Sequence, residues 1–165
     1  MDESTFRQFY DATQKELWAY IRRMTGDESL ASDFAQDAYI RFYNSSGREL
    51  HSSKWKAYLY RVATNIVYDH WRRNKRLKEL TDVLDKRNSM NHQDDYIITH
   101  DIGEAFEQLT PQQRSLLWLA YVDEYKHKEI AEILNLSGKS IRVLLFRAKQ
   151  RFIAILEKCE YHPEK

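Results

Sequence analysis

The C-terminal part of the chain carries a run of positive charge at helical spacing. Between residues 139 and 151 there are five lysines and arginines and no acidic residue. A helix that is only solvated usually mixes charges of both signs, so a face of one sign indicates a polyanionic partner. Lysine neutralises phosphates, and arginine can donate two hydrogen bonds to a guanine edge. The segment therefore favours nucleic-acid binding.

The residues before this segment have the pattern of a helix-turn-helix motif. A short amphipathic helix is predicted over residues 126–134, a turn over 135–137, and a long helix from Gly138 or Lys139 onward. Asn135 tolerates the left-handed backbone that such turns use, and the second helix of the motif enters the major groove. A plain helical hairpin with a solvated face is the alternative. We assign Ile141, Leu145, Ala148 and Phe152 to the core and predict that the opposite face contacts DNA through Lys139, Ser140, Arg142, Val143 and Arg147.

A second basic segment lies near the middle of the chain. Residues 72–78 hold five cations and no acid, and they follow a stretch that contains Tyr58, Tyr60, Tyr68 and Trp71. Aromatic rings stack on bases and cations follow phosphates, so this mixture suits single-stranded nucleic acid. Asn65, a polar residue in an apolar stretch, could pair with a base edge. The alternative is that the aromatic residues form a core and that Asn65 is exposed or bonded internally.

Helical periodicity positions these segments. Apolar residues recur at helical spacing from Phe6 to Ile21, and Gly26-Asp27 ends that helix. A second helix, capped by Ser29 or Ser32, runs to about residue 43 and is followed by a polar loop over 44–53. A third helix runs from about residue 55 to 80. The four glycines and two prolines are too few for many tight turns between strands.

The periodicity fails after residue 81 and returns in the last third of the chain. Thr110, Pro111 and Gln113 form the N-cap, first-position proline and capping-box pattern of a new helix. We therefore predict an all-α protein of two small helical domains. They comprise residues 1–81 and 104–165, and a flexible linker over residues 82–103, which could end in a short helix, joins them.

The remaining composition argues against several classes of protein. Cys159 is the only cysteine, so the chain has no internal disulfide and no cysteine-based zinc site. The six histidines lack paired metal spacing, and there is no Gly-rich phosphate loop or nucleophile elbow. We expect no enzyme activity, no cofactor and no metal. The N-terminus lacks the order of a signal peptide, and no apolar run is long enough to span a membrane, so we expect a cytoplasmic protein.

Three segments resemble the motifs of the bacterial sigma-70 family, and in particular the small two-domain group called extracytoplasmic-function (ECF) sigma factors. They are SDFAQDAYIRFY (32–43), WKAYLYRVATNIVYDHWRR (55–73) and the stretch 109–152, from LTPQQRSLLWLAYV to LLFRAKQRF. Each motif alone is weak, but their order and spacing are specific. The resemblance implies a sigma factor that directs core RNA polymerase to specific promoters and assists their melting.

The resemblance also implies roles for particular residues. The first domain would correspond to sigma region 2 and the second to region 4, with core polymerase binding them through its clamp coiled coil and flap. The last helix would read the −35 promoter element through the face named above. The loop 44–53 would hold a base flipped from the non-template strand. Core polymerase would contact Asp33, Gln36, Asp37, Ile40 and Arg41, and the −10 element would contact Arg48, Arg61, Asn65, His70, Arg72, Arg73 and Arg76.

The recognition helix departs from the family pattern. Where the family commonly has threonine, valine, lysine, serine and arginine, residues 140–144 read SIRVL. Val143 could touch a thymine methyl group. Alternatively, Val143, Leu144 and Phe146 form an exposed apolar surface for a protein partner. By resemblance, that partner would be an anti-sigma factor. The linker acids Asp94 and Asp95 could imitate nucleic acid inside the polymerase.

Two other classes of function are compatible with the residues. One is a helix-turn-helix regulator that binds duplex DNA as a dimer, which leaves the basic and aromatic segment of the first domain unexplained. The other is a sigma-like decoy that binds polymerase without recognising promoters. For a sigma factor we expect a monomer when free of partners, with core polymerase, promoter DNA and an anti-sigma factor as its partners and no insertion into a membrane.

Overall fold

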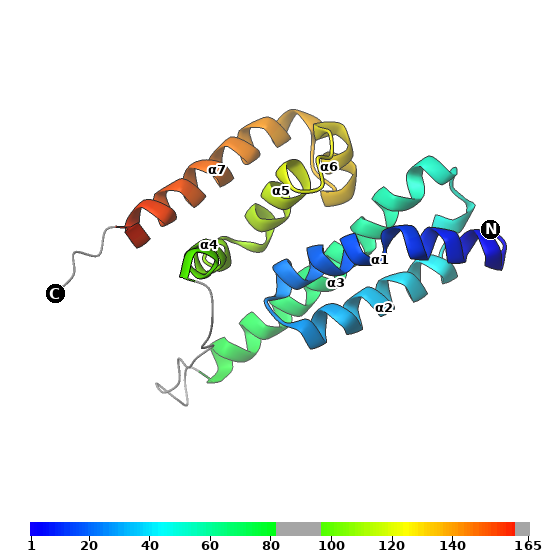
Figure 1. The fold of residues 1–165 in the computed structure, drawn as a ribbon, viewed down its shortest axis with the longest axis horizontal. Coiled ribbons are helices and arrows are strands. Elements are labelled where there is room, and N and C mark those ends of the chain that lie inside the picture. The colour runs from blue at the N-terminus through cyan, green and yellow to red at the C-terminus, as the bar shows by residue number, and fades with distance from the viewer. Residues whose placement is uncertain (82–96, 161–165) are drawn as a thin grey trace.

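The computed structural model of the 165-residue chain describes residues 1–81 and 97–160. Every regular element in these two ranges is helical, which confirms the predicted all-α class (Figure 1). Asp94 and Asp95, for which we predicted that they imitate nucleic acid, lie outside the described residues. The elements are α1 (Glu3–Thr25), α2 (Glu28–Asn44), the short 3₁₀ helix η1 (Ser46–Glu49), α3 (Ser52–Thr81), α4 (Ile97–Glu107), α5 (Pro111–Tyr121), α6 (His127–Leu134) and α7 (Gly138–Glu160).

The N-terminal unit is a bundle of α1, α2 and α3. Gly26 ends α1 in a left-handed conformation (φ 73°), which a glycine adopts without strain. Asp27 then caps α2 by accepting a hydrogen bond from the Leu30 amide at 3.0 Å. The predicted caps Ser29 and Ser32 are therefore wrong. Aspartate is as favourable as serine at the N-cap position. Because Asp27 directly follows Gly26, it begins the helix before Ser29 or Ser32 is reached.

The C-terminal unit comprises α4 to α7. The predicted capping box is confirmed: Gln113 N donates to Thr110 Oγ1, and Thr110 N donates to the Gln113 side chain. Asn135 has the predicted left-handed conformation (φ 53°) and ends α6. Helix α4 begins at Ile97, inside the range 82–103 that we assigned to a linker with a short helix at its end. Gly103 lies within this helix, whereas the sequence predicted that the linker ends and the second domain begins at this point.

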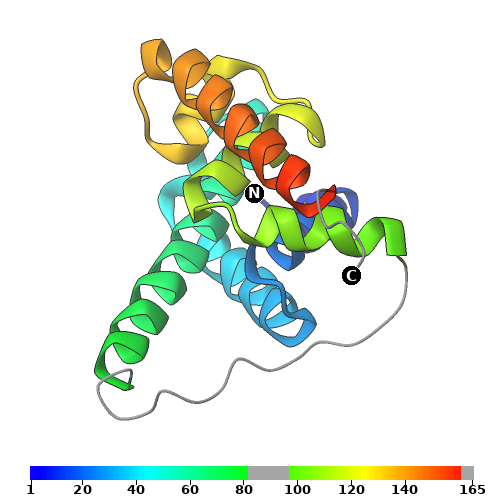
Figure 2. The same ribbon diagram turned by 90° about the vertical axis from the view of Figure 1, so that its left-hand side faces the viewer.

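The two units pack against each other. Figures 1 and 2 show the C-terminal helices lying along the side of the α1–α3 bundle. Helix α6 contacts α3, and α5 contacts α1 and α3. One buried hydrophobic cluster includes Tyr20 and Tyr60 from the first unit and Leu116 and Ile130 from the second. A second, smaller cluster lies between α4, α5 and α7. The pattern of two domains on a linker did not indicate this shared core.

Arg114 lies at the centre of the contact between the units. Only 3% of this α5 residue is exposed. Its Nη1 donates to the Met24 carbonyl of α1 at 3.2 Å, its Nε donates to the Leu109 carbonyl at 3.1 Å, and its Nη2 donates to the Glu107 carbonyl. The guanidinium carbon is 4.6 Å from the centroid of the Trp71 ring on α3. The fixed fork of donors on α5 therefore joins α1 and the end of α4, and the Trp71 ring adds a contact from α3 at the same point.

The surroundings of Arg114 explain why this position needs arginine. The Met24 carbonyl belongs to the last turn of α1, where carbonyl groups have no partner within the helix. Burial lowers the pKa of the guanidinium, and the nearby Glu107 carboxylate opposes that shift. The hydrogen bonds of the guanidinium all go to backbone oxygens. The carbonyl dipoles and the face of the Trp71 ring therefore stabilise its positive charge.

Replacing Arg114 should destabilise the whole protein. We expect Arg114→Ala to lower the free energy of unfolding by about 3 kcal/mol, because it leaves buried carbonyl groups without donors. Arg7→Ala removes an exposed arginine of α1 and should change it by less than about 0.5 kcal/mol. Urea unfolding followed by tryptophan fluorescence measures both. Equal effects of the two substitutions would contradict the structural role of Arg114.

Candidate nucleic-acid and polymerase interfaces

Helix α7 has the two faces that the sequence predicted. Ile141, Leu145 and Ala148 are buried, and Phe152 is half-buried with its ring 6.1 Å from that of Phe106. The opposite face, predicted to read DNA, is exposed at every position except Ser140, which is half-buried at the start of the helix. The exposed members of the predicted set are Lys139, Arg142, Val143 and Arg147.

The charge of this face is available to a ligand. Lys139, Arg142 and Arg147 form no ion pair with any acidic residue in the described part of the chain. Val143 is 49% exposed and Phe146 is 62% exposed. Leu144 is instead half-buried against the main core, so the apolar surface that we expected from three residues consists of two. The exposed face of α7 therefore presents both cations and apolar side chains to a groove of DNA.

The predicted −10 residues of α3 fall into two groups. Arg61, Asn65 and Arg72 are spaced by four and seven residues, which places them on one face of the helix, and all three are exposed. Arg72 forms an ion pair with Asp69 at 2.8 Å. Asn65 is therefore accessible to a base, and its exposure also agrees with the alternative of a simply exposed asparagine. Arg73 and Arg76 are also exposed and extend the positive charge toward the end of the helix.

His70 and Arg48 lie apart from that face. The His70 ring is 5.2 Å from the Phe34 ring of α2, and its Nε2 is 3.0 Å from the Asn74 amide nitrogen. Burial, followed by the charge of Arg73, lowers the pKa of His70, so its ring is mainly neutral at pH 7. Arg48 lies in η1, where its guanidinium carbon is 5.5 Å from the centroid of Tyr43. The structure thus does not bring all seven predicted residues together.

The aromatic residues of α3 mostly pack inside the protein. Tyr60 is fully buried, Tyr68 donates a hydrogen bond of 2.9 Å to Ser115 on α5, and Trp71 covers Arg114. Tyr58 approaches Gly47 so closely that a side chain at Gly47 would collide with its ring. The expectation that this cluster offers stacking surfaces for bases is therefore wrong for the buried Tyr60. Periodicity alone does not separate an aromatic core from a stacking surface.

The predicted polymerase-binding residues form an exposed strip on α2. Asp33, Gln36, Ile40 and Arg41 are exposed, and Ile40 leaves 53% of its surface uncovered. The half-buried Asp37 forms an ion pair with Arg41 at 2.8 Å. A hydrophobic side chain flanked by charges on an open helix face is typical of a protein-binding surface.

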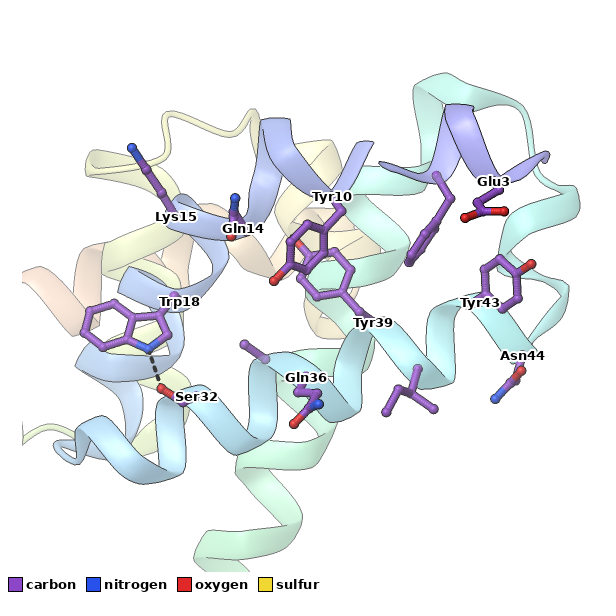
Figure 3. Close-up of a pocket in the computed structure, with 13 residues that line it drawn as sticks. Glu3, Tyr10, Gln14, Lys15, Trp18, Ser32, Gln36, Tyr39, Tyr43 and Asn44 are labelled. Atoms are coloured by element: carbon purple, nitrogen blue, oxygen red, sulfur yellow. Dashed lines mark hydrogen bonds between the residues drawn. The ribbon is translucent and has the colours of Figure 1, made fainter. Parts of the chain in front are cut away.

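A groove between α1 and α2 adjoins this strip. Its volume is about 910 Å³, and Gln36 and Ile40 line one wall. Figure 3 labels Gln36 on that wall. Tyr10 and Trp18 of α1 form part of the other wall, and Trp18 Nε1 donates to Ser32 Oγ at 3.1 Å. From its periodicity we expected α1 to be an amphipathic helix of the core. The partial exposure of its aromatic residues, which sequence alone does not report, extends the surface beyond α2.

Asp123 is an acidic residue at the contact between the units. Burial raises its pKa to about 6, and the neighbouring Glu16 carboxylate adds to the rise. The Lys56 ammonium, which pairs with Glu16 at 2.5 Å, acts in the opposite direction. Glu16 and Lys56 belong to the N-terminal unit, whereas Asp123 follows α5. The charged form of Asp123 is therefore disfavoured by the packing of the two units.

Residues 1–81 and 97–160 contain no group of three or more histidine, cysteine, aspartate or glutamate side chains placed to hold a metal ion. In the same ranges no helix is both long and apolar enough to cross a membrane.

The fold defines a class of small helical proteins that carry a C-terminal helix-turn-helix on a three-helix bundle. Within this class, a family model described as "Sigma-70 region 2" matches residues 9–77. A second, described as "Sigma-70, region 4", matches residues 99–152. The two models fall on the two units of the structure. The chain belongs to the sigma-70 family, and its relatives place it among the ECF sigma factors.

Individual relatives match along nearly the whole chain. The ECF RNA polymerase sigma factor SigM of Bacillus subtilis (strain 168) is 29% identical over 163 residues, which cover 93% of this chain and 96% of SigM. SigW of the same organism is 26% identical over 163 residues, covering 90% of this chain and 87% of SigW.

Two solved structures share the fold. One is the sigma factor RpoE in complex with the anti-sigma factor NepR from Bartonella quintana, with a TM-score of 0.74, 20% identity, and coverage of 93% of this chain and 97% of that one. The other is CnrH in complex with the cytosolic domain of CnrY, with a TM-score of 0.69, 21% identity, and coverage of 95% and 90%.

The raised pKa of Asp123 predicts a pH dependence of stability. The native structure favours the neutral acid, so the contribution of Asp123 to stability should be fully present below about pH 4 and should be lost as the pH rises through about 6. Asp123→Asn is neutral at every pH and should melt at a higher temperature than the unmodified protein at pH 7.5. The gap should close as the pH falls from 6 to about 4. Calorimetry across this range measures it, and a gap that does not change with pH would contradict the assignment.

Proposed function

We propose that the chain is a promoter-specificity subunit of bacterial RNA polymerase, which directs core polymerase to a set of promoters. The observation that carries the proposal is that region 2 and region 4 matches fall on two units that each expose a fitting surface. These surfaces are the exposed basic face of α7 and the apolar and charged strip of α2. The protein would have no catalytic activity of its own and would act in the cytoplasm.

Each surface takes one role in this proposal. Helix α7 enters the major groove at the −35 element, with Arg142 donating to base edges and Lys139 and Arg147 contacting phosphates. On α3, Asn65 reads a base of the −10 element between the phosphate contacts of Arg61 and Arg72. The N-terminal domain (1–81) and the C-terminal domain (104–165) act at separate elements, and residues 82–103 join them. The strip on α2 binds core polymerase through Asp33, Gln36, Asp37, Ile40 and Arg41.

Melting follows from the same contacts. Extruding one base from the duplex costs a few kcal/mol, so a protein that binds the extruded base both selects sequence and favours strand separation. Loop 44–53 with Arg48 would hold such a base, and Arg73 and Arg76 would lie on the adjoining duplex. His70, half-buried beside Phe34, would orient this end of α3 more than it would contact DNA directly. Phosphate contacts make the affinity for promoters fall with salt concentration.

Control by an anti-sigma factor is part of the proposal. The RpoE and CnrH structures, which resemble this chain over nearly its full length, were solved with an anti-sigma factor and with the cytosolic domain of CnrY, respectively. The uncovered side chains of Val143 and Phe146 and the groove between α1 and α2 offer apolar surface for a protein of this kind.

In vitro transcription tests the proposed function. Core polymerase free of sigma factors is combined with genomic promoter fragments, with and without the protein. Specific initiation that depends on the protein supports the proposal, and the aligned start sites give the −35 and −10 elements. Binding to polymerase without initiation would favour a decoy. Absence of both would favour a duplex-binding regulator, whose dimer would be visible by sedimentation.

Asn65→Ala should impair recognition of the −10 element selectively. We expect initiation to fall by about 10-fold, because one paired contact to a base edge is worth about 1–3 kcal/mol. The affinity for core polymerase, measured by fluorescence anisotropy, should not change, since Asn65 is on α3 and the polymerase strip is on α2. Gln8→Ala removes an exposed amide from α1, outside the surfaces named above, and serves as the matched control. Equal loss of initiation and polymerase affinity would show a structural role for Asn65.

Arg142→Ala should weaken initiation that depends on the −35 element. A loss of about 10-fold is expected at promoters with an intact element, and a much smaller loss where that element is scrambled. Arg151→Ala removes the same charge from an exposed position further along α7 and should have little effect. An unchanged promoter preference in the Arg142 variant would remove this residue from the reading face.

A further inference from the structure

An apolar groove lies between α4, α5 and α7. Its volume is about 550 Å³, which falls within the range of roughly 300–1,000 Å³ that is usual for small-molecule sites. Phe106, Leu117 and Phe152 line the groove and are buried or half-buried, so they form a fixed apolar surface. The proposed function does not use this groove.

The edge of the groove leaves apolar side chains uncovered. Ile102 of α4, Tyr121 at the end of α5, Val122 after it and Ile153 of α7 all line the groove and are all exposed. Single exposed apolar residues are ordinary on a protein surface, whereas several around one hollow indicate a binding site.

The charged side chains that line the groove are both positive. The guanidinium carbon of Arg23, on α1, lies 5.9 Å from the centroid of the Phe106 ring and 6.0 Å from that of Trp118. Lys149 Nζ, on α7, lies 5.9 Å from the centroid of Tyr121. Among the described residues no acidic side chain lines the groove, and neither cation forms an ion pair there. The groove therefore favours a ligand that has an apolar body and a negative charge.

We propose that this groove binds a fatty acid, with the carboxylate at Arg23 and the alkyl chain along Leu117, Phe152 and Leu156. The rings attract the guanidinium through their faces, but they do not supply the pair of oxygen acceptors that a carboxylate offers to arginine. Lys149 adds a second positive charge. The alkyl chain needs no polar partner, which suits a groove whose other lining is apolar or aromatic.

This site is separate from the surfaces of the proposed function and does not depend on that function. The α7 residues of the groove lie between Lys149 and Leu156, beyond the positions predicted to read DNA, and the groove includes no residue of the strip on α2. Binding can therefore be measured without polymerase or promoter DNA.

Titration of the full chain with decanoate tests the proposal. Calorimetry at pH 7.5 and low salt, at concentrations at which decanoate forms no micelles, should show one saturable site. Hexanoate should bind at least about 10-fold more weakly, because it buries fewer methylene groups. Decyltrimethylammonium, which has the same chain and a positive head, should also bind at least about 10-fold more weakly, because both cations repel it. Absence of saturable decanoate binding, or equal affinities for the three compounds, would overturn the proposal.

Arg23→Gln tests the location of the carboxylate. We expect the affinity for decanoate to fall by about 10-fold, because the variant loses the charged pair of donors. Arg7→Gln removes the same charge from an exposed position of α1 outside the groove and should bind decanoate as the unmodified protein does. Equal affinities of the two variants would contradict the role of Arg23.

Ile153→Asp tests the groove itself. A carboxylate at this exposed edge should lower the affinity for decanoate by at least about 10-fold through repulsion and lost apolar contact. Gln150→Asp places the same charge at an exposed position of α7 outside the groove and serves as the control. Equal affinities, with circular dichroism showing both variants folded, would contradict the site. Binding of an acidic amphipathic peptide in the groove, without any binding of decanoate, would assign it to a protein partner and overturn the proposal.

Discussion

The guanidinium of Arg114 is the group on which the arrangement of the two units depends. A buried cation is stable only where its donors are satisfied, and here the acceptors are carbonyl groups of α1, of the last residue of α4 and of the segment that follows α4. The Trp71 ring of α3 covers the same group. Because these acceptors belong to both units, the charge is solvated by protein only when the units are together. The shared hydrophobic core is built around this point.

This constraint decides which surfaces are open. The basic face of α7 and the strip on α2 lie away from the contact between the units, and both are exposed. The face of α3 that carries Arg61 and Asn65 is exposed as well, although Arg61 lines a groove with residues of α6. The packing of the units therefore leaves all three candidate surfaces open.

Much of the local structure could be predicted from the sequence, because capping and helical periodicity depend on neighbouring residues. Thr110, Asn135 and the buried face of α7 are examples. The contact between the units could not be predicted, since periodicity reports that Tyr60 and Trp71 face something apolar without saying which segment it is. Their aromatic character suggested base stacking instead. The three sequence motifs indicated the order of the candidate interfaces along the chain. The structure was needed to distinguish Asn65 and Arg61, whose side chains are exposed, from His70, which is half-buried.

The central claim is that Arg114 holds the two units together around a shared core. Energy transfer between dyes on α2 and α7 tests it most directly, with cysteines introduced by Glu28→Cys and Glu157→Cys in a Cys159→Ser background, since both glutamates are exposed. The account predicts one population of high transfer for the protein with Arg114 and a clear fall in transfer when Arg114→Ala is added. Equal transfer in the two proteins would contradict it.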